Sequence, residues 1–141
     1  MEFDLLKGRF SIEQVRMLSP LVLAFVGDAI YEVFIRTYLV DKNRNFTVHK
    51  LHTETVKYVK SHSQSEFIKK IESELTQEEE YFFKRGRNAK SGTVPKNSDL
   101  VEYRFATGFE ALLGFLYMTE QTKRLDYILE KMICIKENGG I

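Results

Sequence analysis

The stretch from Leu21 to Val40, LVLAFVGDAIYEVFIRTYLV, is an apolar run that carries a carboxylate, Asp28, in its most hydrophobic half. It follows Ser19 and Pro20, and a serine N-cap before a first-turn proline predicts that a helix starts here. Its first half is apolar on every side, which predicts burial. Because burying an unpaired carboxylate costs several kcal/mol, Asp28 requires a cation, a network of donors or a metal ion as partner.

A second stretch at 101–118, VEYRFATGFEALLGFLYM, has the same character and holds Glu110 in its apolar middle. Glycine costs about 1 kcal/mol inside a helix, so an interior glycine usually marks a close approach of another backbone. Gly27 lies beside the first acid, and Gly108 and Gly114 flank the second. We therefore expect the two helices to pack closely with their acids facing each other.

The rest of the chain shows helical rather than strand periodicity. Thr47 predicts the start of one helix, and Thr76 with Glu79 forms a capping box that starts another. A group of serines after residue 60 predicts a break, and a last helix is predicted over 123–136. With 141 residues, 43% of them apolar, we expect one all-α domain that spans residues 1–141.

Charge is strongly segregated in the middle of the chain, although the net charge is only +1. Between residues 72 and 80 there are five acids and no base, and between 81 and 97 five bases and no acid. The basic part is also rich in glycine, asparagine and serine, which predicts an extended loop with free backbone donors. Such a loop suits phosphate oxygens, but its cations could equally neutralise the adjacent acids.

Two carboxylates on facing helices near a basic loop suggest a magnesium site that acts on a phosphodiester. Mg²⁺ takes oxygen ligands, commonly one or two carboxylates completed by water and substrate phosphate. The alternative is purely structural, with Asp28 and Glu110 paired to Arg36, Arg104 or lysine side chains in the core.

Two motifs carry a resemblance to a known family. The run AFVGDAIYE at 24–32 resembles the signature helix of the ribonuclease III family, and FEALLGFLY at 109–117 resembles the second catalytic helix of that family. Between them lies KRGRNAKSGTVPKN at 84–97, and no double-stranded-RNA-binding domain follows. The chain is therefore similar to the Mini-III branch of the family.

This resemblance implies an all-helical homodimer that cuts double-stranded RNA with Mg²⁺, for which Mn²⁺ is a substitute, and leaves 5′-phosphate and 3′-hydroxyl ends. For the Mini-III branch it implies maturation of 23S ribosomal RNA precursor, helped by a large-subunit ribosomal protein. Asp28 and Glu110 match the catalytic, metal-binding acids. Two further acids of larger members are replaced by Ala24 and Thr107, so water, Thr107 or Glu32 would complete the ligands.

The substrate and the second subunit would meet different parts of the chain. The interface between subunits is expected at Phe25, Val26 and Ile30, unless these residues belong to the core of a monomer. The residues expected to bind RNA are Arg85, Arg87, Asn88, Lys90, Ser91 and Lys96.

Two other functions are compatible with the sequence. One is a catalytically weak RNA- or ribosome-binding protein of the same fold, and the other is a helical hydrolase of small phosphate compounds. The N-terminus lacks the pattern of a signal peptide, and Asp28, Glu32 and Arg36 make the apolar run costly to insert in a membrane. With a single cysteine, Cys134, we expect a cytoplasmic protein without membrane contact.

Overall fold

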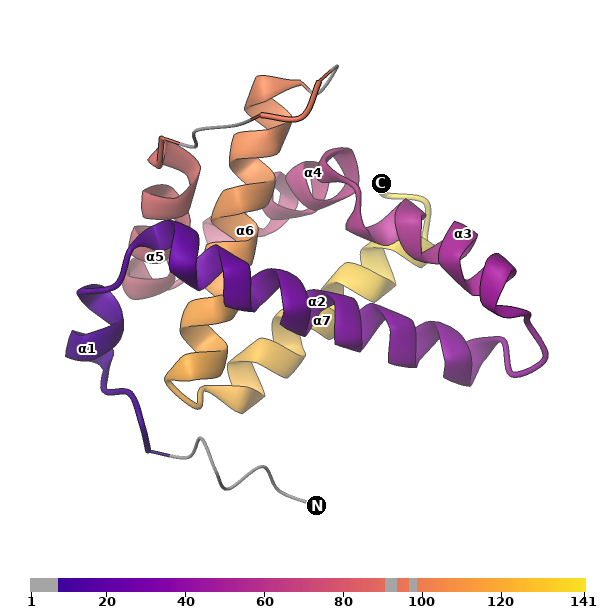
Figure 1. The fold of residues 1–141 in the computed structure, drawn as a ribbon, viewed down its shortest axis with the longest axis horizontal. Coiled ribbons are helices and arrows are strands. Elements are labelled where there is room, and N and C mark those ends of the chain that lie inside the picture. Colours follow the sequence, from indigo (N-terminus) through magenta and orange to yellow (C-terminus); the bar gives the residue numbers. More distant parts are fainter. Residues whose placement is uncertain (1–7, 91–93, 97–98) are drawn as a thin grey trace.

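The structure, a computed structural model, describes residues 8–90, 94–96 and 99–141. Every regular element within these ranges is helical, so the all-α prediction is confirmed (Figure 1). In chain order the elements are α1 (Ile12–Arg16), α2 (Pro20–Lys42), α3 (Val48–Val59), α4 (Ser61–Ile71), the short 3-10 helix η2 (Glu72–Glu74), α5 (Gln77–Asn88), α6 (Leu100–Met118) and α7 (Thr122–Glu137).

Helix α6 forms the centre of the molecule, and α2, α4, α5 and α7 pack around it (Figure 1). All its residues from 111 to 116 are buried. Aromatic rings join the layers: Phe115 stacks on Phe82 of α5 at 4.0 Å between ring centroids, and Phe109 meets Tyr31 of α2 edge-on at 5.3 Å. Offset and edge-on ring pairs of this kind add to the free energy gained from burial.

Helices α2 and α6 cross at two glycines, as the sequence predicts. A Cβ atom added to Gly27 would overlap the carbonyl oxygen of Glu110 and lie 2.9 Å from the amide nitrogen of Gly114. A Cβ on Gly114 would overlap the carbonyl oxygen of Leu23. Because both obstacles are backbone atoms, only glycine permits this crossing, and the crossing brings Asp28 beside Glu110.

The third predicted glycine serves a different contact. Gly108 faces Phe83 of α5 rather than α2, and Gly86 of α5 lies against Gly108 and Ala111. A second close crossing, between α5 and α6, therefore places the end of α5 against Thr107, Gly108 and Ala111 of α6.

The helix starts follow local capping chemistry. Ser19 caps α2 ahead of Pro20, and Thr76 with Glu79 forms the expected capping box of α5. The break after α3 falls at Lys60, and the serines that predicted it lie inside α4. One of them, Ser63, donates to the carbonyl of Lys57 across the break, at 2.6 Å. Within the described ranges, no helix combines the length and the apolar character needed to cross a membrane.

Candidate active site

The carboxylates of Asp28 and Glu110 lie in hydrogen-bonding contact across the crossing of α2 and α6. Burial, together with the contact and the charge of Asp28, raises the pKa of Glu110 to about 9. The structure therefore favours a protonated Glu110 at neutral pH when no cation is present, because two adjacent carboxylates repel each other when both are ionised.

The surroundings of the pair exclude the structural alternative. Arg36 pairs with Glu32 at 2.8 Å, and neither Asp28 nor Glu110 forms an ion pair in the part of the chain that the structure describes. The prediction that the first half of α2 is buried on all sides is wrong, since Val22, Phe25 and Asp28 are exposed. Glu110, on α6, is half-buried. The two acids thus face an opening to solvent, which suits a ligand from solution.

Gln64 of α4 is a site residue that the sequence analysis missed. Its side chain is only 2% exposed, its Nε2 donates to the carbonyl of Val59 at 2.8 Å, and its amide also contacts Glu110. This contact lowers the pKa of Glu110, although less than burial and Asp28 raise it. The Oε1 atom of Gln64 is buried without a hydrogen-bond partner. The sequence shows only a glutamine between two serines, Ser63 and Ser65, and this pattern does not indicate contact with Glu110.

The positions of the two replaced acids have structural roles. Ala24 is buried in the core, and Thr107 donates from Oγ1 to the carbonyl of Tyr103 at 3.0 Å. Glu32 is held by Arg36, but its charge still raises the pKa of Glu110. No group of three or more His, Cys, Asp or Glu side chains suited to a metal occurs among the described residues.

Of the predicted RNA-binding residues, the two arginines contact other parts of the protein, whereas the two lysines are exposed. Arg85 donates to the carbonyls of Arg16 and Leu18 at 3.0 and 3.1 Å, and these bonds hold the end of α1 and the start of α2 against α5. Arg87 lies over the rings of Phe83 and Phe105 and donates to Asn88. Lys90 and Lys96 are exposed, and Ser91 lies outside the described residues.

The acidic run before the loop is neutralised mainly by other parts of the chain, and Lys84 is the base of the 81–97 segment that pairs with one of its acids. Glu79 is buried and accepts two hydrogen bonds from Arg124 of α7, at 2.7 and 2.9 Å. The other ion pairs of the run are Glu74 with Lys131, Glu78 with Arg16 and Glu80 with Lys84. Arg87, Lys90 and Lys96 form no ion pair with these acids in the described ranges, which leaves their charge available for a phosphate.

The three residues predicted at a subunit interface differ in exposure. Phe25 is 79% exposed, whereas Val26 and Ile30 are half-buried and Ile30 packs against the core. An exposed phenylalanine three residues from Asp28 is costly in water, so Phe25 does not belong to a monomer core.

The comparisons with known proteins agree with the fold. Residues 21–121 match the model of the ribonuclease III domain, which covers both acid-bearing helices. The chain therefore belongs to the ribonuclease III family, and it is an endoribonuclease.

Relatives narrow this to one branch of the family. A protein of Clostridium tetani named Mini-ribonuclease 3 is 46% identical over 93% of this chain and 87% of its own length. Another protein of that name, from a Thermoanaerobacter species, is 51% identical over 89% of this chain and 87% of its own length. A crystal structure of a protein from Fusobacterium nucleatum superimposes with a TM-score of 0.77 at 33% identity, over 88% of this chain and 97% of that one. The branch is thus Mini-ribonuclease 3, as the resemblance predicts.

Proposed function

We propose that the chain is a Mg²⁺-dependent endoribonuclease that cuts double-stranded RNA. In this reaction the oxygen of a water molecule forms a bond to phosphorus, the bond from phosphorus to O3′ breaks, and O3′ takes up a proton. The products have 5′-phosphate and 3′-hydroxyl ends. The observation that carries the proposal is the solvent-facing contact between Asp28 and Glu110, to which the described protein supplies no cation.

The residues present fit a hydrated Mg²⁺ ion, with Mn²⁺ as a substitute. Two carboxylates with water and a substrate phosphate are a common ligand set for Mg²⁺. Asp28 and Glu110 would hold the ion, and the buried, unpartnered Oε1 of Gln64 offers an acceptor for a water of its hydration shell. When bound, the ion supplies positive charge at the scissile phosphate and lowers the pKa of its bound water.

The protein residues around the pair have separate roles in this proposal. The Gln64 amide orients Glu110, and the glycine crossing fixes the distance between α2 and α6. Arg87, Asn88, Lys90 and Lys96 contact the phosphates and sugars of the duplex, as does Ser91 in the loop. Arg85 is left out because its guanidinium is already bound to two carbonyls.

We also propose that two copies of the chain act together through α2. Cutting both strands of a duplex requires two active sites at a fixed separation, which two-fold symmetry supplies. The exposed Phe25 supports this arrangement. From the family resemblance we further propose that the substrate is 23S ribosomal RNA precursor in the cytoplasm and that a large-subunit ribosomal protein assists.

The proposal is tested by removing the charge of each acid. Asp28→Asn and Glu110→Gln should each lower Mg²⁺-dependent cleavage of duplex RNA by more than about 100-fold, since loss of outer-shell partners alone costs 10–100-fold. Both variants should still bind the duplex in Ca²⁺. Matched controls are Asp126→Asn and Glu130→Gln, which change exposed acids of α7. Cleavage that persists in either site variant and still requires Mg²⁺ would reject the metal-ligand roles.

A further inference from the structure

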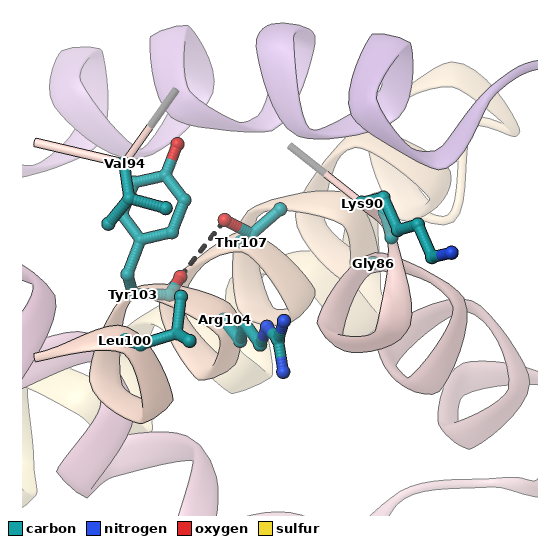
Figure 2. A pocket seen from close by; sticks show the side chains of 8 residues that line it. Gly86, Lys90, Val94, Leu100, Tyr103, Arg104 and Thr107 are labelled. Atoms are coloured by element: carbon teal, nitrogen blue, oxygen red, sulfur yellow. Dashed lines mark hydrogen bonds between the residues drawn. The ribbon is translucent and has the colours of Figure 1, made fainter. Parts of the chain in front are cut away.

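A cavity of about 300 Å³ opens between the end of α5 and the first turns of α6 (Figure 2). Its wall combines two cations, an aromatic ring, a hydroxyl group and small or apolar side chains. The lining residues are Gly86, Ala89, Lys90, Val94, Leu100, Tyr103, Arg104 and Thr107.

The charges of this cavity are unbalanced. Lys90 and Arg104 line it, and no carboxylate does. Neither cation forms a hydrogen bond or an ion pair with any residue in the described ranges. Both cations are exposed, and two unpaired cations beside one cavity give it a positive potential that favours an anionic ligand.

Two helices, α5 and α6, supply most of the cavity wall, and the segment between them supplies Ala89, Lys90 and Val94. Gly86 allows α5 to approach α6 closely, which brings Lys90, two residues beyond the end of α5, to the side of the cavity opposite the start of α6. Thr107 is fixed by its bond to the carbonyl of Tyr103, which Figure 2 shows as a dashed line, and it is almost buried. Arg104 comes from the same helix, one turn before Thr107.

The cavity adjoins the acid pair along α6. Thr107 and Glu110 are three residues apart, so they lie on the same side of the helix, about 4.5 Å apart along its axis. Arg104 is six residues from Glu110, which places it about 9 Å away along the axis and about 120° around the helix, with Thr107 between them. A phosphate bound by Arg104 would therefore belong to the strand a few nucleotides from the cut rather than to the scissile position itself.

We infer that this cavity binds a backbone phosphodiester of the RNA strand that is cut, with Arg104 and Lys90 as its ligands. The inference rests on the proposed function and adds a second phosphate site to it. The planar guanidinium of Arg104 donates two parallel hydrogen bonds to the phosphate, and Lys90 adds a point charge. Because phosphate contacts carry no sequence information, the site fixes the register of the strand at Glu110 without a base preference.

The test measures binding of a duplex RNA whose cleavage position has been mapped with the unaltered protein. Binding is measured in Ca²⁺ over a series of salt concentrations, with single uncharged methylphosphonate linkages placed at successive positions around the cut. Arg104→Ala should weaken binding about tenfold and lower the salt slope by about one unit, and Arg104→Lys should keep the slope. Arg44→Ala is the matched control, because Arg44 is paired with Asp41 in the turn after α2.

The decisive result is coupling between Arg104 and one linkage. At that position the neutral linkage should weaken binding by the unaltered protein about tenfold but weaken binding by Arg104→Ala by much less, because only the point charge of Lys90 still contacts that phosphate. Additive losses at every position, or a salt slope that Arg104→Ala does not change, would overturn the inference. Since binding alone is measured, this outcome is distinguishable from failure of the cleavage proposal, which the acid variants test.

Discussion

At the scale of single residues, Asp28 and Glu110 differ in what surrounds them. Asp28 is exposed on α2, whereas Glu110 is half-buried between α2, α4 and α6. Burial and the neighbouring acid raise the pKa of Glu110 to about 9, far above its ordinary value of 4.5. In the proposed reaction a proton and Mg²⁺ would compete for this carboxylate, and this competition would link catalysis, pH and stability.

Stability without divalent ions should fall as the pH rises from about 5 to 9. The raised pKa means that folded Glu110 keeps a proton that the unfolded chain has released across this range, so each increase in pH favours unfolding. Urea denaturation at pH 6 and pH 8.5 in EDTA measures the effect. Glu110→Gln should show a smaller fall than the unaltered protein, and Mg²⁺ should stabilise the unaltered protein more at pH 8.5 than at pH 6. Equal pH dependence in the two proteins would mean that Glu110 ionises normally.

At the scale of elements, the fold depends on where two helices cross. Alanine normally stabilises a helix by about 1 kcal/mol relative to glycine. At Gly27 the added methyl group would instead overlap the backbone of Glu110, which cannot move without separating α2 from α6.

Gly27→Ala should therefore destabilise the protein by about 4 kcal/mol or more, in the range of severe core substitutions, and should abolish cleavage because the acids move apart. The free energy of unfolding in urea measures the first effect. Ala29→Gly, at an exposed position two residues along the same helix, should cost only about 1 kcal/mol and serves as the control. A Gly27→Ala protein as stable as the original would contradict the crossing.

The same scale shows what the sequence can and cannot predict. Caps and turns act locally, so Ser19, Thr76 and Glu79 predicted helix starts correctly. Interior glycines are costly unless a backbone approaches, so Gly27 predicted the crossing and with it the meeting of the acids. The partners of Arg85 depend on tertiary packing, since α1 lies almost 70 residues earlier in the chain, and no local pattern revealed them.

Gln64 and Arg104 were missed as site residues for the same reason. Each becomes significant only through its position relative to α6: Gln64 through its contact with Glu110 and its unpartnered oxygen, Arg104 through the cavity that it lines. Residue spacing along the chain predicts which side chains are neighbours on one helix. The contacts of Gln64 and Arg104 instead bring together residues of α4, α5 and α6.

At the scale of the whole molecule, the outer side of α2 carries exposed apolar side chains. Val22, Phe25 and Val33 follow helical spacing along this side, and Phe25 and Val33 are 79% and 63% exposed. Such a stripe is more apolar than the surface of a soluble monomer usually is. Asp28 lies at its edge, so a second copy packed there would hold two acid pairs at a fixed separation.

In the proposed dimer, Phe25→Glu should give a monomer, because the partner would have to bury a carboxylate in place of a ring. Light scattering after size exclusion should give the mass of one chain, 16.5 kDa, rather than two, and duplex cleavage should fall with it. The monomer should keep its helical content, since Phe25 contributes little to its core. Val56→Glu, at a 56% exposed position on α3, is the control and should stay dimeric. A Phe25→Glu protein that remains a dimer would place the interface on another face.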